Sequence, residues 1–399
     1  MIKLNRRVGM LKPSATLAAE ARAIELREAG KNVISLAAGE PDFDTPERIK
    51  QAARAAMAEG LTKYTAVSGT SRIKQAICAK LKRENGLVYE PAEVMATAGG
   101  KPAAANLINA LFDEGDEFII PTPAWVSFIA MVQLSGATPK LVPTAERDGF
   151  RLSPSSLEAA LTPATRGIIL NSPCNPTGAV YQEEHLRALA RIFVEAKLWV
   201  ISDDVYEHIS YGGPIPHLFA IEPRLKEHGI VINSLSKSYA MTGWRIGMAA
   251  GPREVIAAAT RLQGQNASNP NSIAQAAAVE ALNGPQDDVR QMAAEFHRRR
   301  DFVVERVRTI PGFSLPNVPE GAFYVFPNVS ALLACKWNGQ PVGDGDGLAR
   351  ILLDEALVST VGGTDFGAPQ FVRLSYANSL ENLREAFDRI EGVTRKLLG

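Results

Sequence analysis

Residues 230–247 of this chain read IVINSLSKSYAMTGWRIG. The apolar run Ile230–Ser234 predicts a buried strand, and the sequence passes from it directly into Leu-Ser-Lys, which ends at Lys237. Arg245 stands eight residues after the lysine. A lone lysine is usually a solvated surface residue, but this one follows a buried strand, lies among hydroxyl groups and is trailed by an arginine. The pattern therefore favours an amine held in a desolvated site that also carries a phosphate.

Other apolar runs place this strand in a sheet. They are Val94–Ala98, Glu117–Pro121, Gly167–Asn171, Leu198–Asp203 and Ile246–Ala250. Ala-rich helical stretches separate the runs, and strands that alternate with helices predict an α/β fold with a mostly parallel sheet. In such sheets, ligands bind beyond the carboxyl ends of the strands. Polar residues directly after each run are therefore expected to converge.

The pattern changes after this region, which predicts a second, smaller unit. Residues 287–310 predict one long amphipathic helix, and beyond it the segments 321–326 and Phe371–Ser375 predict strands, with a helix after Gly347. Because 399 residues exceed the usual size of one hydrophobic core, we expect two domains. The predicted division is an N-terminal lid and part of the small domain in residues 1–45, a large domain in 46–290, and a small C-terminal α+β domain in 291–399.

The composition argues against several classes of function. Lysine plus arginine and aspartate plus glutamate number 43 each, so the formal net charge is zero and no global field draws the chain to nucleic acid or to an anionic membrane. The three cysteines lack Cys-x-x-Cys spacing, which argues against a disulfide framework or a zinc site and fits a reducing compartment. The five histidines form no metal-spaced pair, and no stretch approaches the roughly 18 apolar residues of a membrane span. We expect a cytoplasmic protein that binds no metal, nucleic acid or membrane.

Two groups of polar residues lie at predicted strand ends. Gly99-Gly100-Lys101 precede an Ala-rich helix whose N-terminal N–H groups suit a phosphate, although Gly-Gly before a helix is more often just a tight turn. Asp203 ends one apolar run, and Tyr206 follows three residues later. An acid in this position is otherwise a helix N-cap. Together with Lys237, these groups predict an amine, an acid and an anion site at one edge of the sheet.

The residues around Lys237 resemble a known motif. Ser-x-Ser-Lys followed by Gly-Trp-Arg-Ile-Gly is similar to the cofactor-lysine motif of the class I and II aminotransferases, which are fold-type I pyridoxal 5′-phosphate (PLP) enzymes. The resemblance extends in order through Leu36–Pro46, Lys63-Tyr64, Asn175–Gly178, Ser202–Tyr206 and Val372–Tyr376. Within the family, the chain most resembles the bacterial aspartate aminotransferases of subgroup Ib, whose relatives also act on prephenate. This resemblance implies the PLP-dependent transferase fold (type I), with a mostly parallel seven-stranded sheet between helices and a smaller α+β domain.

The resemblance also implies how PLP is held. Lys237 would condense with the PLP aldehyde and then carry a proton as general base and acid, while the Asp203 carboxylate would face the pyridine nitrogen and keep it protonated. Tyr206 and Asn175 would donate hydrogen bonds to the 3′-oxygen of the ring, and Trp125 would stack on its face. The phosphate would be bound by Gly100, Lys101, Ser234, Ser236 and Arg245, and by Tyr64 of a second subunit. The expected functional unit is therefore a homodimer with shared active sites.

The substrate is expected to bind beside the cofactor. The resemblance assigns its α-carboxylate to Arg373, whose forked guanidinium would bind it bidentately with help from Asn175 and the Gly39 backbone, and it places Trp125 against the substrate as well. An arginine at a strand end is otherwise usually a surface residue. Lys12, in a Lys-Pro-Ser segment that matches a flexible N-terminal lid of the branch, is the candidate partner for a distal carboxylate; a solvated lysine is an equal alternative.

The expected partners are small molecules, namely amino acids and 2-oxo acids. The leading prediction is transfer of an amino group from an L-amino acid, aspartate or glutamate, to 2-oxoglutarate or oxaloacetate by a ping-pong mechanism. Prephenate or an aromatic amino acid is the alternative substrate, and a PLP carbon–sulfur β-lyase is the alternative reaction on this fold. Ala124 stands where a tyrosine usually precedes the tryptophan of this branch, which leaves the substrate open.

Two further classes are disfavoured. A transcriptional regulator with a PLP-binding half carries an N-terminal DNA-binding domain, and fewer than about 50 residues precede the first family motif here. A nicotinamide-dependent dehydrogenase is disfavoured because no Gly-x-Gly-x-x-Gly follows a strand.

Overall fold

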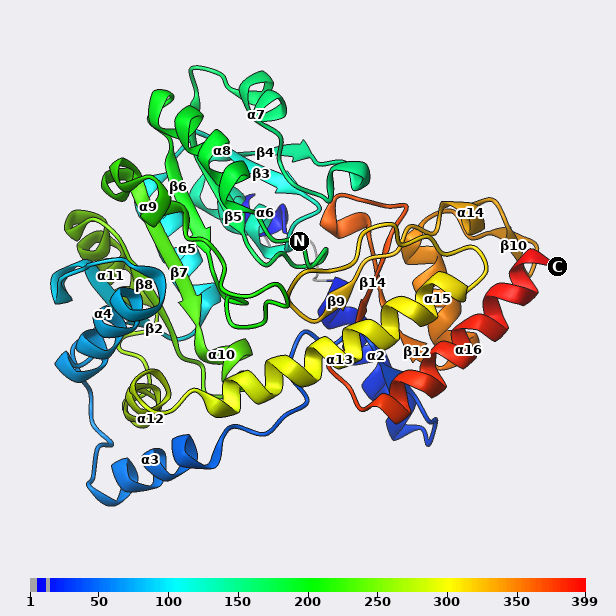
Figure 1. The fold of residues 1–399 in the computed structure, drawn as a ribbon, viewed down its shortest axis with the longest axis horizontal. Coiled ribbons are helices and arrows are strands. Elements are labelled where there is room, and N and C mark those ends of the chain that lie inside the picture. The colour runs from blue at the N-terminus through cyan, green and yellow to red at the C-terminus, as the bar shows by residue number, and fades with distance from the viewer. Residues whose placement is uncertain (1–5, 12–14) are drawn as a thin grey trace.

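A seven-stranded sheet forms the core of the larger of two groups of elements in the computed structural model, which describes residues 6–11 and 15–399 (Figure 1). The strand order across the sheet is β2-β8-β7-β6-β5-β3-β4. The strands are β2 (Val94–Thr97), β3 (Glu117–Thr122), β4 (Thr138–Pro143), β5 (Thr165–Asn171), β6 (Trp199–Asp203), β7 (Gly229–Ser234) and β8 (Gly247–Ala250). β8 runs antiparallel to both of its neighbours, and the other pairs are parallel. The predicted fold class, a mostly parallel seven-stranded sheet in an α/β protein, is confirmed.

Strand β4 has no counterpart among the apolar runs of the sequence. It contains Pro139 and Pro143, and most of its residues are exposed or half-buried. It lies at the edge of the sheet and pairs in parallel with β3. An edge strand needs no continuous apolar run and tolerates proline, because one side of its backbone has no strand partner. Hydrophobic patterning therefore detected the other six strands, including β2 at the opposite edge, and missed β4.

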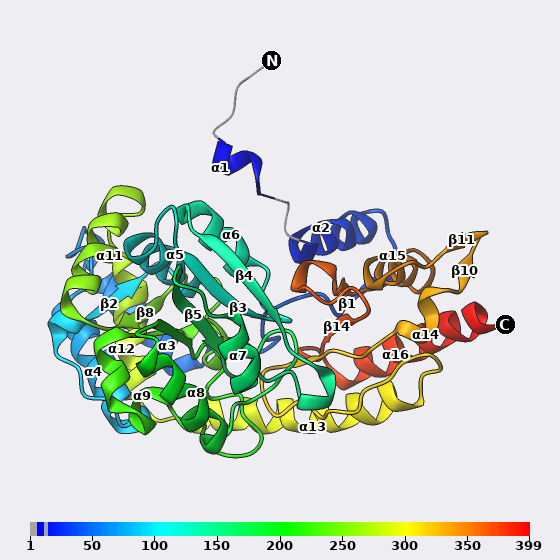
Figure 2. The same ribbon diagram turned by 90° about the horizontal axis from the view of Figure 1, so that it is seen from above.

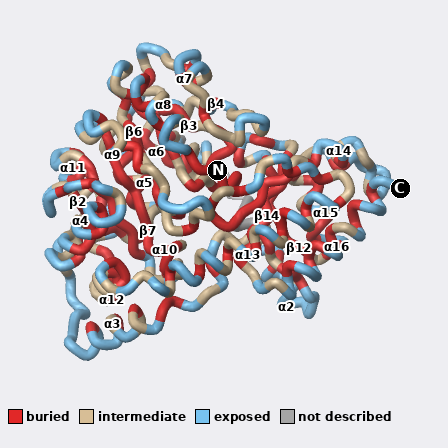
Figure 3. The backbone as a smooth tube through the Cα atoms, in the orientation of Figure 1, coloured by how far each residue is buried: buried red, intermediate tan, exposed pale blue. Residues whose placement is uncertain are grey.

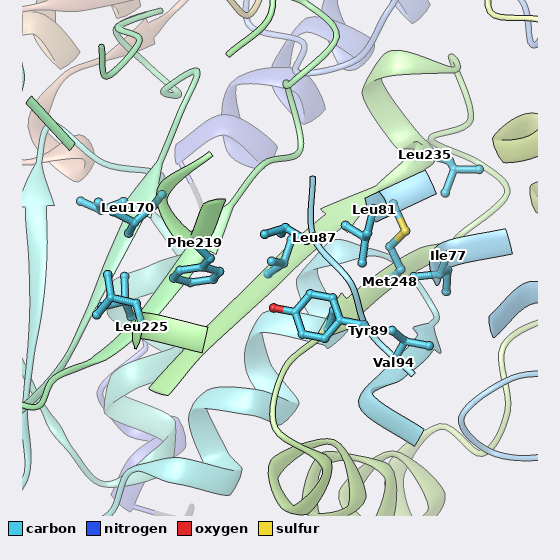
Figure 4. Packing of buried hydrophobic residues seen from close by; sticks show 14 of the residues in the cluster. Ile77, Leu81, Leu87, Tyr89, Val94, Leu170, Phe219, Leu225, Leu235 and Met248 are labelled. Carbon is cyan, nitrogen blue, oxygen red and sulfur yellow. The ribbon is translucent and has the colours of Figure 1, made fainter. Parts of the chain in front are cut away.

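Helices cover both faces of the sheet, and each face has its own core. One face carries α5 (Gly100–Leu111), α6 (Ser127–Ser135) and α11 (Arg253–Asn266), and the other carries α4 (Ser71–Asn85), α8 (Glu183–Glu195), α9 (Leu218–Ile221) and α12 (Ser272–Asn283) (Figure 2). On the second face, Ile77 and Leu81 of α4 lie beside Val94 and Met248 of the sheet (Figure 4). Burying one such side chain stabilises the fold by about 1.5–3 kcal/mol. The strands are accordingly buried while the outer faces of the helices are exposed (Figure 3).

A long helix, α13 (Asp287–Thr309), leads from this sheet to a second group of elements (Figure 1). This group contains the antiparallel sheet β13 (Val361–Gly362), β14 (Val372–Ser375) and β9 (Tyr324–Val325), together with α15 (Gly345–Ala356) and α16 (Leu380–Leu398). The predicted long helix is confirmed to within one residue. Helix α15 begins two residues earlier than Gly347, because the Asp344 side chain accepts a hydrogen bond from the Gly347 N–H and caps the helix there.

Residues 15–35 lie with this second group. Strand β1 (Ile34–Ser35) pairs in parallel with β12 (Val358–Ser359), and α2 (Ala15–Glu28) lies beside both. The boundaries predicted for the domains stay a prediction.

The remaining elements are short or lie at the periphery. They are α1 (Arg6–Gly9), α3 (Glu47–Ala58), α7 (Pro154–Ala160), α10 (Leu235–Ser238), α14 (Ser330–Leu333), β10 (Lys336–Trp337), β11 (Gln340–Pro341) and the 3₁₀ turns η1 (Pro91–Glu93), η2 (Glu146–Asp148), η3 (Pro223–His228) and η4 (Thr364–Phe366). Within residues 6–11 and 15–399, no helix combines the length and apolarity needed to cross a membrane. Cys78, Cys174 and Cys335 are free thiols.

Candidate active site

The candidate site lies at the carboxyl ends of β5, β6 and β7. Asn171 ends β5 and is paired in register with Asp203, which ends β6 and is paired with Ile232 of β7. Because these strands are parallel, their carboxyl ends meet at one edge of the sheet. Strand β7 then passes into the short helix α10, which carries Lys237. The structure thus brings the predicted acid and the predicted amine to the same edge.

Lys237 is a half-buried amine with no carboxylate bound to it. Its Nζ donates a hydrogen bond of 2.5 Å to the carbonyl oxygen of Gly39. Removal from water lowers the pKa of Lys237 to about 8, against the opposing charge of Glu40 and with a smaller contribution from the cations Arg373 and Arg245. At this pKa about one tenth of the side chain is the free amine at pH 7, far more than for an ordinary lysine. A free amine can act as a nucleophile or accept a proton.

Asp203 is a buried carboxylate with few partners. It is 7% exposed, and among the described residues its carboxylate accepts one hydrogen bond, from the backbone N–H of Val205 at 3.3 Å. Burial raises the pKa of Asp203 to about 7, with a smaller contribution from the neighbouring Asp204 and against the lowering effect of the Val205 N–H. Asp204, in contrast, accepts hydrogen bonds from Ser202 Oγ at 2.6 Å and from His217 Nε2 at 3.0 Å. Asp203 is therefore the acid that has room for a donor or cation from outside the chain.

The raised pKa of Asp203 makes the stability of the cofactor-free protein depend on pH. The folded protein holds the Asp203 proton up to about pH 7 while the unfolded chain loses it near 3.8, so stability is lost as the pH rises through this window. Since one pKa unit corresponds to about 1.4 kcal/mol, we expect Asp203→Asn to raise the Tm of the cofactor-free protein by at least about 3 °C at pH 8 and to leave it unchanged at pH 4. Differential scanning calorimetry at both pH values measures this.

Asp204→Asn is the matched control for that measurement. It removes a paired carboxylate one residue away, so it should lower the Tm at pH 8. Equal shifts from the two variants, or a lower Tm for Asp203→Asn at pH 8, would contradict the assignment of Asp203 as an underpaired acid.

A buried guanidinium faces the same region from the second sheet. Arg373 of β14 is 2% exposed, and its Nη1 donates to Asn175 Oδ1 at 3.0 Å while Nη2 donates to the Ala37 carbonyl at 2.7 Å. Its Nε is buried without a hydrogen-bond partner, and no carboxylate of the described chain pairs with it. Burial lowers the pKa of Arg373 from its ordinary value. A buried cation in this condition is suited to an anion such as a carboxylate.

Tyr206 links this guanidinium region to the strand end. It follows Asp203 by three residues, is 3% exposed, and its Oη lies 2.9 Å from Tyr324 Oη. Burial raises its pKa well above the ordinary value, so the phenol stays protonated and can donate a hydrogen bond.

An anion cradle lies on the far side of Lys237, at the start of α5. Gly99 precedes this helix with φ +111°, no side chain caps the helix, and the N–H groups of Gly100 and Lys101 have no acceptor within the described chain. A Cβ at Gly99 would lie 2.7 Å from Arg245 Nη2, and a Cβ at Gly100 would lie 3.2 Å from the Ser234 Cβ. Because neither glycine has a side chain, the backbone at the start of α5, the Ser234 hydroxyl and the Arg245 guanidinium can lie close together. Free N–H groups at a helix N-terminus beside an arginine bind phosphate well.

Other predicted residues border this cradle. Ser234 Oγ donates to Ser236 Oγ at 2.7 Å, which ties the two hydroxyls together. Lys101 Nζ lies 5.0 Å from the centroid of the Trp125 ring, and burial lowers its pKa, with a further contribution from Arg245. Neither Lys101 nor Arg245 has a carboxylate partner among the residues that the structure describes. Four cations, the other two being Lys237 and Arg373, thus border the site with no carboxylate in ion-pair contact among the described residues, which suits a ligand with more than one negative charge.

Two predicted residues are not brought into this cluster. Tyr64 is 91% exposed and does not reach the site of its own chain. Lys12 lies outside the described residues.

Sequence reasoning named no role for two residues that the structure brings into the site. Asn171 donates from Nδ2 to the Asp203 carbonyl at 3.0 Å, and its Oδ1 accepts from the Asn175 N–H at 2.9 Å, so it fixes the strand end and the following loop together. The signal for it was present, because Asn171 ends an apolar run as Asp203 does. Tyr324 stands between Phe323 and Val325, and nothing in that apolar pattern separates it from a core residue.

A cavity of about 830 Å³ lies elsewhere, between the loop after β6 and the first half of α13. Its charged residues satisfy one another: Glu207 is paired with the buried Lys80, and Asp204 is paired with His217. Glu84, Glu207 and His208 lie close enough to hold a metal ion, but the Lys80 ammonium already pairs with both carboxylates, at 3.6 Å from Glu84 and in contact with Glu207. The charged groups that lack partners among the described residues therefore lie at the strand ends, and not in this cavity.

Comparison with known proteins matches the whole chain. The family model described as aminotransferase class I and II matches residues 31–390. The chain is 46% identical to an aspartate aminotransferase of Geobacillus stearothermophilus and 47% identical to an aspartate/prephenate aminotransferase of Cereibacter sphaeroides, with 98% of each chain covered in both cases. The crystal structure of an aspartate aminotransferase from Rhizobium meliloti superposes with a TM-score of 0.95 at 44% identity and covers 100% of both chains.

Proposed function

The chain belongs to the class I and II aminotransferase family, and we propose that it transfers the amino group of L-aspartate or L-glutamate to a 2-oxo acid with PLP bound at the strand-end site. The observation that carries this proposal is the pair formed by a half-buried amine and an underpaired buried acid, Lys237 and Asp203, at one edge of the sheet. The aspartate aminotransferases among the relatives support aspartate as the amino donor.

The residues of the site fit PLP. The cofactor carries a phosphate, an aldehyde, a pyridine nitrogen and an anionic ring oxygen, and each of these groups has a counterpart here. Gly100, Lys101, Ser234, Ser236 and Arg245 would hold the phosphate, and the uncapped start of α5 supports this. When bound, PLP supplies an electron-withdrawing ring that stabilises negative charge at the substrate Cα.

Lys237 moves the proton in this proposal. Its lowered pKa, about 8, lets Nζ exist as the free amine and take a proton from the substrate Cα, then return it as an ammonium. Nζ must leave the Gly39 carbonyl to do so, and a single hydrogen bond of 2.5 Å holds it there. The Gly39 carbonyl thus holds the amine near the site between steps.

Asp203 holds a proton on the pyridine nitrogen. Its own pKa of about 7 reflects burial without a cation, and a protonated ring nitrogen against the carboxylate would lower that pKa. The carboxylate would then stay ionised and would favour a protonated ring nitrogen. Asn171 supports this arrangement by fixing the Asp203 backbone.

Tyr206, Asn175 and Trp125 complete the ring site, and Arg373 binds the substrate. Tyr206 and Asn175 would donate to the ring oxygen, and Trp125 would cover the ring face. The Arg373 guanidinium, with its unpaired Nε, would take the α-carboxylate, and Asn175 already contacts Arg373. Because β14 belongs to the smaller sheet, carboxylate binding would draw the two groups of elements together and expel water.

The assembly that we propose is a homodimer in which Tyr64 of one chain reaches the phosphate site of the other. The 91% exposure of this large side chain supports the proposal, since an exposed tyrosine of this kind is typical of an interface. We also propose that Lys12 binds a distal carboxylate of the substrate. The proposed location of the protein is the cytoplasm.

Prephenate is the second candidate, as amino acceptor, because a relative at 47% identity is named an aspartate/prephenate aminotransferase. No observation favours the carbon–sulfur β-lyase reaction.

A panel of amino donors assayed against 2-oxoglutarate tests the proposed function. With PLP-loaded protein, we expect aspartate to give the highest kcat/KM and glutamate to form in equal amount to oxaloacetate; prephenate is then tested as acceptor with each active donor. Release of pyruvate and ammonia without glutamate formation would overturn the proposal in favour of a lyase.

A further inference from the structure

Tyr324 contacts three groups of the candidate site at once. It lies on β9, is 0% exposed, and its Oη is 2.9 Å from the Oη of Tyr206. The Arg373 guanidinium lies over its ring, 4.5 Å from the centroid. The same Oη would lie 3.2 Å from a Cβ at Gly39, whose carbonyl accepts the hydrogen bond from Lys237.

Once Tyr206 donates a hydrogen bond to a ligand, the direction of the hydrogen bond between Tyr206 and Tyr324 is fixed. Burial raises the pKa of both tyrosines, so each keeps one proton at neutral pH. If Tyr206 gives its proton to the anionic ring oxygen of PLP, its own oxygen can only accept from Tyr324. Tyr324 is then the donor at 2.9 Å, and a phenol that accepts one hydrogen bond donates the next more strongly.

The ring of Tyr324 has a second role, in its contact with Arg373. The guanidinium lies over two aromatic rings, that of Tyr324 at 4.5 Å and that of Phe366 at 5.2 Å, and has no carboxylate partner in the described chain. Cation–π contact stabilises a desolvated guanidinium and fixes its plane. The ring therefore orients the group that would bind the substrate carboxylate.

We propose that Tyr324 is a positioning residue that serves both ends of the site: its hydroxyl donates to Tyr206 and so strengthens the hydrogen bond to the PLP ring oxygen, and its ring orients Arg373 for the substrate carboxylate. The proposal rests on the proposed PLP site. Tyr324 itself touches neither cofactor nor substrate in this account.

Two substitutions separate the two tasks. Tyr324→Phe removes the hydroxyl and keeps the ring, so it should raise the pKa of the visible absorbance change of bound PLP by about half to one unit, because a ring oxygen with a weaker donor holds its proton more tightly. Its KM for aspartate should stay within about twofold of wild type. Tyr324→Leu removes the ring as well and should also raise the KM, by about five- to tenfold.

Tyr376→Phe is the matched control. Tyr376 is a second buried tyrosine in the same sheet region, 0% exposed, with its Oη 3.0 Å from that of Tyr211. The Tyr376→Phe variant loses the same hydroxyl from a similar pair of phenols. Tyr376 is hydrogen-bonded to neither Tyr206 nor Arg373. The absorbance pKa of this variant should equal that of wild type.

A double substitution gives a second, independent test. In a Tyr206→Phe background, Tyr324→Phe should add no further change in the absorbance pKa, since its effect passes through Tyr206. An unchanged pKa in Tyr324→Phe, an equal shift in Tyr376→Phe, or full additivity in the double variant would each overturn the proposal. Absence of PLP binding by wild type would instead overturn the proposed function, so the two failures are distinguishable.

Discussion

Replacing Lys237 by alanine is expected to lower the rate of amino transfer by at least about 10³-fold and to abolish the visible absorbance of lysine-linked PLP. In the proposed mechanism, the amine at this position would supply both the bond to the cofactor and the proton carrier. Lys101 is the other lysine that borders the site, but its ammonium lies over the Trp125 ring, 5.0 Å from the centroid, and cannot take over both tasks. Steady-state assays with aspartate and 2-oxoglutarate measure the loss.

Two further measurements complete this experiment: the Tm of the variant, which tests whether it is folded, and its activity with an added small amine. The alanine variant should keep its Tm within a few degrees, because Lys237 makes one hydrogen bond in the structure. Added methylamine should restore part of the proton transfer. A Lys237→Ala protein that retained a tenth of wild-type turnover would contradict the assignment.

Arg373→Ala should lower kcat/KM for aspartate by about 10²- to 10⁴-fold, mainly through substrate capture. The guanidinium is buried, hydrogen-bonded to Asn175 and the Ala37 carbonyl, and left with an unpaired Nε. Without it, the α-carboxylate would lose its bidentate partner, because the other cations of the site lie at Lys237 and beside the start of α5. Initial rates over a range of aspartate concentrations give the change in kcat/KM.

Two companion variants separate charge, geometry and packing at this position. Arg373→Lys keeps the charge and loses the fork, so its kcat/KM should fall between those of wild type and the alanine variant. Arg373→Met keeps the apolar part of the side chain and should match the alanine variant in activity while retaining more stability. A methionine variant with near wild-type kcat/KM would show that the carboxylate binds elsewhere.

The strand-end rule explains why so much of this site could be predicted from the sequence. Asp203 and Ser234 each close an apolar run, and parallel strands carry them to one edge, where α10 adds Lys237. Local patterning sufficed because the information lies within a few residues of each strand. It failed for β4, whose edge position removes the apolar signal, and for the strand expected over 321–326, which forms only at Tyr324–Val325 with an isolated bridge at Gly321.

Tyr324 and Asn171 needed the structure for a different reason. Their partners, Tyr206 and Asp203, are 118 and 32 residues away in the sequence, and a single hydroxyl or amide carries no pattern that predicts such a contact. Tyr64 and Lys12 stay predictions: the role of Tyr64 needs a second copy of the chain, and Lys12 lies outside the described residues.

The buried Asp203 carboxylate lowers the stability of the folded protein. A buried carboxylate with one backbone donor destabilises the cofactor-free protein at neutral pH, and the same feature makes it ready to hold a protonated ring nitrogen. We therefore expect PLP binding to stabilise the protein most where Asp203 is ionised.

The most direct measurement is chemical mapping of the cofactor lysine. PLP-loaded protein is reduced with sodium borohydride, digested, and searched by mass spectrometry for the pyridoxyl phosphate adduct. The account predicts the adduct on Lys237, with no comparable labelling in protein first incubated with aspartate, which moves the cofactor off the lysine. An adduct on another lysine in fully active protein, or none at all, would contradict it.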